Sequence, residues 1–304
     1  MTTVPPILAI VGPTASGKSE LALDVAQRVG AEIINADAMQ LYQGMDIGTA
    51  KLSPEERRGI PHHQLDVLDI RAEASVAAYQ RRARADIAQI HARGRPAMVV
   101  GGSGLYVRAV LDRLEIPPTD SAVRARLQSE LEQEGVERLH RRLTSVDPPA
   151  GAAIEANNGR RIVRALEVIE LTGRSFSATM PHREYLLPTR TIGLSVERPK
   201  LDERIERRVH RMWEQGLLAE VQTLLQQGLR DGRTASRAVG YSQAVAHLDG
   251  EMTAAQAQDG TVTATRRLAR RQESWFGPDP RITWLPQDAS DLLDRTLALV
   301  DADG

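Results

Sequence analysis

The feature that most constrains the fold is a glycine-rich turn at residues 12–19, Gly-Pro-Thr-Ala-Ser-Gly-Lys-Ser. It matches in full the phosphate-binding loop (P-loop) pattern G-x-x-x-x-G-K-[ST]. An apolar run at residues 7–11 precedes the turn, and a helical pattern follows it as far as Gly30. This is the strand–turn–helix context in which backbone N–H groups and a helix N-terminus surround phosphate oxygens. The sequence therefore predicts an α/β fold that binds a diphosphate-like group.

Further apolar runs indicate more strands separated by helices. Residues 32–37 and 97–100 predict two buried strands, and a helix is expected over residues 75–93 between them. Residues 191–196 and 282–285 predict two later strands. Strands that alternate with helices are typical of a doubly wound parallel sheet. We therefore expect an α/β protein with a P-loop NTPase-like core.

Polar residues directly follow three of these strands. They are the loop that begins at Gly12, the carboxylate of Asp37 and the hydroxyl of Ser103. Ligands of open parallel sheets bind at the carboxyl ends of the strands. We therefore expect these three groups to converge on one site.

The middle of the chain has a different character. From Ala122 to about Gly173 the periodicity is helical, and no strong strand pattern appears. We therefore predict that a P-loop α/β core domain, residues 1–117 and 185–304, is interrupted by a helical insertion domain, residues 118–184.

Composition excludes several classes of protein. The chain has 304 residues, a formal net charge of −1 and no cysteine, so disulfides, thiolate zinc sites and cysteine nucleophiles are excluded. The first residues lack the basic and apolar regions of a signal peptide. No run of about 18 or more apolar residues is present, which argues against a membrane span. We expect a cytoplasmic protein with no membrane partner.

The ligand of the P-loop and the role of Asp37 stay open at this level. The loop suits ATP, GTP or another diphosphate, with Lys18 reaching the outer phosphate and Ser19 as a ligand of Mg²⁺. A motor-type NTPase should also have an apolar strand that ends in aspartate, yet residues 99–100 lead into Gly-Gly-Ser. Asp37 fits a general base or a Mg²⁺ ligand about as well as a turn cap.

The chain resembles the tRNA dimethylallyltransferase (tRNA isopentenyltransferase) family in several stretches that occur in order between about residues 7 and 285. Besides the P-loop, these stretches are residues 37–51, 61–66, 100–106, 160–168, 238–241 and 265–272. The resemblance implies transfer of a dimethylallyl group from dimethylallyl pyrophosphate to the exocyclic amine of the adenosine 3′-adjacent to the anticodon in tRNA. Pyrophosphate would be released, and ATP would not be used.

The same resemblance implies roles for individual residues. Asp37 would deprotonate or hydrogen-bond the adenosine amine, and Ser103 would assist near the transferred group. The family usually has threonine where this chain has Ser103, and serine where it has Ala38. The P-loop residues would bind the substrate pyrophosphate: Gly12, Pro13, Thr14, Ala15, Ser16, Gly17, Lys18 and Ser19.

Contacts with the tRNA anticodon stem-loop are also implied, with Mg²⁺ as the cofactor and a monomer as the expected state. The implied tRNA-binding residues are Asp37, Ala38, Met39, Gln40, Ser103, Arg124, Arg160, Arg161, Arg164, Arg266 and Arg270. For the arginines of residues 160–164, the competing interpretation is a solvated helix face paired with Glu167 and Glu170. Two like-charge i,i+4 pairs occur on a later helix: Arg266 with Arg270, and Arg267 with Arg271. Such stacked positive charge favours an anionic partner.

Two other functions remain as alternatives. A P-loop nucleoside or small-molecule kinase predicts ATP binding and a phosphorylated product. An RNA-binding protein with a non-catalytic P-loop predicts that Asp37→Ala spares every activity. Neither the donor range nor the set of tRNAs follows from the sequence.

Overall fold

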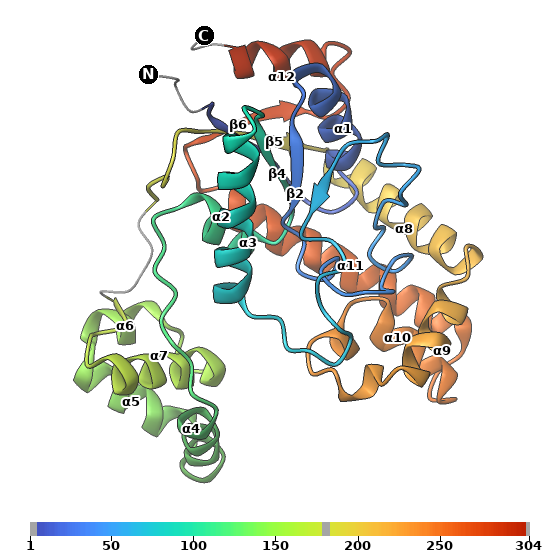
Figure 1. Ribbon diagram of the computed structural model, residues 1–304. Helices are drawn as coiled ribbons and strands as arrows, with labels where there is room; N and C mark the ends of the chain where they lie inside the picture. The colour runs from blue at the N-terminus through green and yellow to red at the C-terminus, as the bar shows by residue number, and fades with distance from the viewer. Residues whose placement is uncertain (1–4, 178–182, 302–304) are drawn as a thin grey trace. The chain divides into compact units, whose positions relative to one another are not determined.

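The computed structural model describes residues 5–177 and 183–301, and its ribbon is drawn in Figure 1. The chain divides into two compact units. The larger combines Met1–Leu111 with Tyr185–Gly304, and the smaller is Asp112–Glu184.

The larger unit is built on a six-stranded sheet of order β3-β2-β4-β1-β5-β6, in which every neighbouring pair is parallel. The strands are β1 (Ile7–Val11), β2 (Glu32–Asn35), β3 (His62–His63), β4 (Ala97–Gly101), β5 (Thr189–Ser195) and β6 (Ile282–Pro286). The P-loop strand β1 lies inside the sheet, where Val11 is in register with Gly101 on one side and Gly193 on the other. The predicted parallel, P-loop NTPase-like α/β fold is confirmed.

Helices cover both faces of this sheet, and the alternation of side chains along β1 explains why the strand is apolar throughout. Leu8 and Ile10 pack in a cluster with residues of α1 and α12. Ile7, Ala9 and Val11 face the opposite way, toward residues of α2 and α3. Figure 1 shows α2 in front of the sheet and α1 beside α12. These helices are α1 (Lys18–Val29), α2 (Val76–Ala92), α3 (Gly104–Leu111) and α12 (Leu292–Asp301).

A further group of helices follows β5 and packs on the loop after β2. It comprises α8 (Arg198–Glu214), α9 (Leu217–Gln226), α10 (Tyr241–Leu248) and α11 (Ala254–Phe276). Two 3₁₀ turns, Leu229–Asp231 and Ala235–Arg237, join α9 to α10. Tyr42 and Met45 from the loop are fully buried against Leu217, Val221 and Tyr241 of these helices. This packing fixes the loop beside the carboxyl end of β2.

Two local predictions were wrong. The strand predicted over residues 32–37 ends at Asn35, because the Asn35 amide bonds both the N–H and the C=O of Asp37, each at 3.0 Å. Such a side-chain bond to the backbone two residues on replaces the ladder with a turn. Because His62 and His63 follow Pro61, the sequence predicts a loop there, but they form β3, which pairs with Ile33 and Ile34.

The smaller unit is helical. Its helices are α4 (Ser121–Glu134), α5 (Val136–Val146), α6 (Pro148–Ala153) and α7 (Gly159–Thr172). Leu127, Leu139, Leu143 and Ile162 form a fully buried core between them. Asp120 caps α4 by accepting hydrogen bonds from the N–H groups of Ala122 and Val123, so the chain turns into a helix at that point. Across the part of the chain that the structure describes, every helix is too short or too polar to cross a membrane.

Candidate active site

A cavity of about 1090 Å³ lies at the carboxyl ends of β1, β2 and β4, within the larger unit. Its wall combines the P-loop with Asp37, which were predicted to converge, and with the glycines at the end of β4, whereas Ser103 is not among the residues that line it. It also includes residues 46–47 and 49–54 of the loop after β2, and side chains from α8 and α11. The main lining residues used below are Thr14, Lys18, Asp37, Gln40, Asp46, Lys51, Gly102, Arg208, Arg211 and Gln272.

The P-loop has a backbone that depends on its glycines. Gly12 and Gly17 have φ angles of 141° and 88°. A Cβ added at Gly12 would lie 2.9 Å from the backbone oxygen of Leu194 on β5, closer than real Cβ contacts. Gly17 is the N-cap of α1, so the loop delivers the chain directly into a helix N-terminus. This is the geometry that places partial positive charge at an anion.

The Lys18 ammonium lies at the P-loop and donates a hydrogen bond of 2.6 Å to the backbone oxygen of Pro13. Burial, and then the positive charge of Arg208, lower the pKa of Lys18 from 10.5 to about 7, while the carboxylate of Asp37 opposes the shift. Burial and the neighbouring guanidinium both disfavour the charged form of Lys18, so a negative ligand beside these two cations would be stabilising. The end of the cavity at the P-loop, here called the donor end, therefore suits a diphosphate.

Gln272 of α11 connects the P-loop to the end of β4. Its Oε1 accepts a hydrogen bond of 2.7 Å from the N–H of Thr14, and its Nε2 donates one of 3.0 Å to the backbone oxygen of Gly102. The Thr14 N–H was expected to face a phosphate, but it is committed to Gln272. Gln272 ends the stretch 265–272 that resembles the family, but nothing in the sequence indicated a contact with the P-loop.

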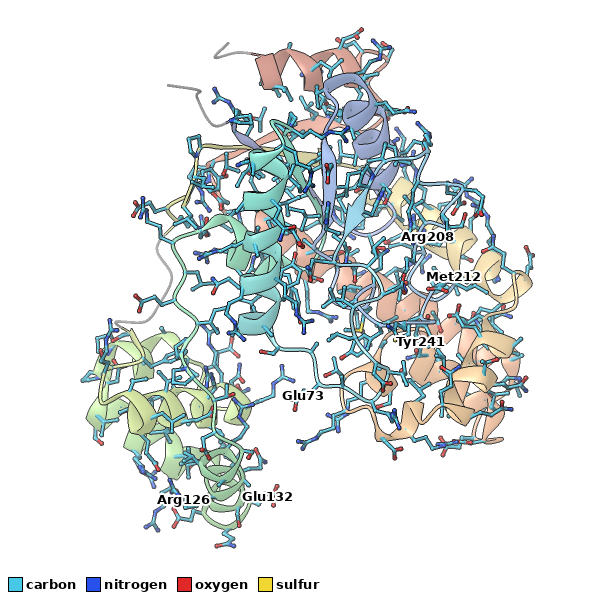
Figure 2. The ribbon with its side chains drawn as sticks, viewed as in Figure 1. Glu73, Arg126, Glu132, Arg208, Met212 and Tyr241 are labelled. Carbon is cyan, nitrogen blue, oxygen red and sulfur yellow. The ribbon has the colours of Figure 1, made fainter. Side chains whose placement is uncertain are left out.

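Arg208 also reaches the P-loop. Its guanidinium donates to the hydroxyl of Thr14 at 3.4 Å, and Figure 2 labels it on α8 beside Met212. Burial, and then the charge of Arg211, lower the pKa of Arg208. No role was assigned to Arg208 from the sequence. Its position matches the family resemblance, but its place in a helix of mixed charge is more typical of a solvated surface.

Asp37 is partly buried at the end of β2, and its Oδ1 accepts a hydrogen bond of 2.9 Å from the N–H of Met39. Burial raises the pKa of Asp37 above 3.8, although the N–H of Met39, the charge of Lys18, the N–H of Gln40 and the charge of Lys51 act in the opposite direction. A carboxylate with a raised pKa is a stronger base than an exposed aspartate.

Ser103 lies beside Asp37, as the sequence predicted from the two strand ends. Its hydroxyl accepts a hydrogen bond of 3.1 Å from the N–H of Ala38, and its own N–H donates to the oxygen of Ala36 at 3.2 Å. The close approach depends on Gly101, because a Cβ there would lie 2.3 Å from the Ala36 oxygen. The Ser103 hydroxyl therefore lies next to the turn that carries Asp37, and Asp37 lines the same cavity as the P-loop.

Comparison with known proteins gives a single family. The sequence model described as IPP transferase matches residues 40–279. A tRNA dimethylallyltransferase of Thermobifida fusca is 60% identical, over 97% of this chain and 94% of the relative. The chain belongs to the IPP transferase family.

Solved structures of similar proteins share its fold. A tRNA isopentenylpyrophosphate transferase from Bacillus halodurans is 39% identical, with a TM-score of 0.72 over 98% of this chain and 97% of that one. A eukaryotic dimethylallyltransferase acting on tRNA is 25% identical, with a TM-score of 0.82 over 97% of this chain and 77% of that one. The kinase alternative is not favoured by these matches.

Two of the arginines predicted from family resemblance to contact tRNA are engaged inside the smaller unit. Arg124 and Arg164 donate to one oxygen of Glu167, at 2.7 and 2.8 Å, and the Glu167 carboxylate is fully buried. Arg164 also donates to the backbone oxygens of Pro117 and Pro118. These contacts match the helix-face interpretation in part, since Glu167 is the acid that it named.

The other predicted arginines are more accessible. Arg160 and Arg161 are exposed at the start of α7, and Arg270 is exposed on α11. Arg266, one turn earlier on α11, pairs with Glu206 at 2.9 Å. Three cations therefore stand free to meet solvent or a partner, whereas Arg266 would first have to leave a carboxylate.

No group of three or more His, Asp or Glu side chains that could hold a metal ion occurs among residues 5–177 and 183–301. Ser19 is exposed at the first turn of α1, next to Lys18. Mg²⁺ binds through few protein oxygens and completes its shell with water and substrate phosphates. A single hydroxyl beside a phosphate site therefore suits Mg²⁺ that arrives with a diphosphate.

Proposed function

We propose that the chain transfers a dimethylallyl group from dimethylallyl pyrophosphate to the exocyclic amine of the adenosine 3′-adjacent to the anticodon in tRNA, and releases pyrophosphate. The observation that carries the proposal is one cavity lined by a P-loop and by an aspartate with a raised pKa, with a serine hydroxyl bonded to the residue after that aspartate. The names of the relatives support tRNA as the acceptor and dimethylallyl as the group transferred, since they are tRNA dimethylallyltransferases.

The donor end would stabilise the leaving group. Breaking the carbon–oxygen bond of the donor moves negative charge onto the pyrophosphate. Lys18, Arg208 and the N-terminus of α1 lie where that charge would grow. Groups that are already oriented toward developing charge lower the barrier most effectively. Ser19 would hold Mg²⁺ at this end of the cavity, and the ion would supply further neutralisation of the leaving group.

The acceptor end would activate the adenosine. An exocyclic amine is a weak nucleophile, because its lone pair is delocalised into the ring. Asp37 would accept one of its protons as the nitrogen attacks the allylic carbon, and Ser103 would hydrogen-bond close to the same atoms. The raised pKa of Asp37 fits this role, since a stronger base removes the proton more readily.

RNA binding would be shared between the exposed arginines and the cavity. Arg160, Arg161 and Arg270 would contact phosphates and so grip the stem-loop, with Arg124, Arg164 and Arg266 recruited from their carboxylates. Ala38, Met39 and Gln40 would lie against the base. The adenosine has to leave its stack to reach the strand ends, which costs a few kcal/mol, about what several phosphate contacts offset.

The test is a transfer reaction with an unmodified anticodon stem-loop, Mg²⁺ and dimethylallyl pyrophosphate. The RNA would be analysed by mass spectrometry, with a parallel reaction that contains ATP alone. We expect a mass gain of one dimethylallyl group that needs no ATP. Unchanged RNA together with consumption of ATP would overturn the proposal in favour of a kinase.

The role of Asp37 is tested in the same assay with Asp37→Ala. We expect transfer to fall by about 10²–10⁴-fold, the range of general-base catalysis, with the affinity for the stem-loop largely kept. Undiminished turnover in this variant would refute Asp37 as the base and leave the reaction class standing.

A further inference from the structure

Glu220 of α9 is an acidic side chain that the reaction described above does not use, yet it makes four hydrogen bonds. Its Oε2 accepts from the N–H of Ile47 at 2.7 Å and from that of Asp46 at 3.2 Å. Its Oε1 accepts from the N–H of Gly48 at 3.3 Å and from the hydroxyl of Tyr241 at 2.6 Å. Three successive backbone N–H groups thus surround one carboxylate, which is the arrangement of a backbone anion site.

Tyr241 of α10, labelled in Figure 2, presses the same loop from the side. Its ring is fully buried, and a Cβ added at Gly48 would lie 2.4 Å from the ring carbon Cε2. The loop backbone therefore lies directly against the ring, and only glycine fits. Glu220 and Tyr241 together fix the position of residues 46–48, here called the clamped loop.

The clamped loop continues into the wall of the cavity. The backbone oxygens of Thr49 and Ala50 accept hydrogen bonds from the side chain of Gln40, at 3.1 and 3.4 Å. Gln40 itself lines the cavity, and its backbone N–H faces the carboxylate of Asp37. A chain of contacts therefore leads from Glu220, through the loop, to the group proposed as the base.

A second anchor lies at the far end of this segment. The Lys51 ammonium is almost completely buried, and it contacts Asp46 at 2.7 Å, Asp66 at 2.6 Å and the backbone oxygen of Tyr42 at 2.8 Å. Asp46 is thus held by its N–H through Glu220 and by its carboxylate through Lys51. With both ends anchored, the intervening wall has little freedom to move away from the acceptor.

We propose that Glu220 and Tyr241 are positioning residues for the transfer reaction: their hydrogen bonds to residues 46–48 hold the cavity wall, and through it Gln40, against Asp37. The inference rests on the proposed function and adds to it two residues of α9 and α10 that are remote in sequence from the proposed base. Neither side chain contacts the reacting atoms. Their effect is on the orientation of the groups that do.

The test compares Glu220→Gln and Tyr241→Phe with Glu203→Gln. Glu203 is an exposed residue of α8 whose carboxylate pairs only with Arg207 in the contacts seen here, so the control removes one charge without touching the loop. The side-chain amide introduced by Glu220→Gln keeps one accepting oxygen. Its NH₂ group, however, would point toward backbone N–H groups of the clamped loop or toward the Tyr241 hydroxyl in place of an accepting oxygen. Tyr241→Phe removes one hydrogen bond and keeps the ring.

We expect kcat to fall by about tenfold or more in Glu220→Gln and by a few-fold in Tyr241→Phe, with the dissociation constant of the stem-loop within about twofold of wild type. Glu203→Gln should behave as wild type. Thermal unfolding of each variant would be measured as well, so that a loss of folded protein is recognised.

The pH profile of kcat separates positioning from simple destabilisation. The Gln40 N–H lowers the pKa of Asp37, so a loosened Gln40 should move the acidic limb to higher pH in Glu220→Gln. Loss of a negative charge alone would move that limb the other way. The charges of Lys18 and Lys51 lower the pKa of Asp37, and the charge of Asp37 raises the pKa values of Tyr79 and Tyr106. All four of these residues are unchanged in the variant.

If Glu220→Gln keeps the kcat of the wild-type protein and its acidic limb does not move, the inference is overturned. Transfer of the dimethylallyl group by the wild-type protein would still support the proposed function. If the wild-type protein itself transfers no dimethylallyl group, the proposed function fails instead. A Glu220→Gln variant that loses activity only in proportion to its unfolded fraction would also overturn positioning, since the folded molecules would then be fully active.

Discussion

Gln272→Leu is the most informative single perturbation of the cavity, because Gln272 is the one side chain seen to bond both the P-loop and the end of β4. Leucine has a similar volume, so the change leaves little space unfilled. It removes the hydrogen bond from Thr14 at 2.7 Å and the one to Gly102 at 3.0 Å. Only glycine fits at position 102, since a Cβ there would lie 2.3 Å from Nε2 of Gln272.

The expected cost follows from what each abandoned partner can do next. A net hydrogen bond is worth about 1 kcal/mol, and a buried group left without a partner costs about 1–3 kcal/mol. Thr14 is half-buried at the cavity, where water can replace the lost acceptor, whereas Gly102 is buried and its oxygen stays unpaired. We therefore expect a loss of about 2–4 kcal/mol in the free energy of unfolding.

The measurement is urea denaturation of Gln272→Leu and of Gln258→Leu, a matched control on the same helix. Gln258 makes one exposed contact, to His210 at 3.2 Å, so its replacement should cost less than about 0.5 kcal/mol. The affinity for dimethylallyl pyrophosphate should also fall in Gln272→Leu alone, because the P-loop loses its anchor on α11. Equal stability and equal donor affinity in the two variants would show that Gln272 merely fills space.

Two further predictions concern pH. Because burial and Arg208 lower the pKa of Lys18 to about 7, the charged lysine destabilises the ligand-free fold below that pH, and this penalty disappears as pH rises toward 10.5. Lys18→Met should therefore be more stable than the wild-type protein near pH 6 and lose that advantage by about pH 10, as measured by denaturation midpoints. A difference in stability that does not depend on pH would contradict the lowered pKa of Lys18. Although burial alone would raise the pKa of Glu167, hydrogen bonds from Arg124 and Arg164 hold it below 4.5, so the stability it contributes is present above that pH and lost as pH falls through the lowered value. Glu167→Gln should cost about 1–3 kcal/mol at neutral pH, and the difference from wild type should shrink below about pH 4, whereas a constant difference would argue that the ion pairs contribute nothing.

The sequence predicted those parts of the fold and site that depend on local pattern. The P-loop follows from eight adjacent residues, and the meeting of Asp37 with Ser103 follows from the rule that parallel strands end at one edge. The end of β2 was misplaced, because the Asn35 side chain competes with the ladder in a way that strand periodicity does not reveal. The strand β3 was missed, since two histidines have no apolar alternation.

Contacts between distant segments were beyond the reach of local pattern. Gln272 meets Thr14 across 258 positions, and Glu220 meets Ile47 across 173. Such pairs arise only when α9 and α11 pack beside the strand ends, and packing of this kind is set by tertiary contacts. Whether an arginine is exposed, as Arg160 is, or tied to a buried acid, as Arg164 is, depends on the same packing.

The opposite pKa shifts of Lys18 and Asp37 connect the two ends of the cavity. Burial lowers the pKa of Lys18 and raises that of Asp37, and the attraction between them limits both shifts. A diphosphate bound at the P-loop adds negative charge close to Lys18, so the ammonium becomes fully protonated and its charge is neutralised by the ligand. With the diphosphate in place, the net charge that Asp37 meets at the P-loop becomes more negative, so its pKa is expected to rise further. If Asp37 is the base, as proposed, donor binding would make it a stronger base without any movement of the chain and would couple occupation of the P-loop to proton removal.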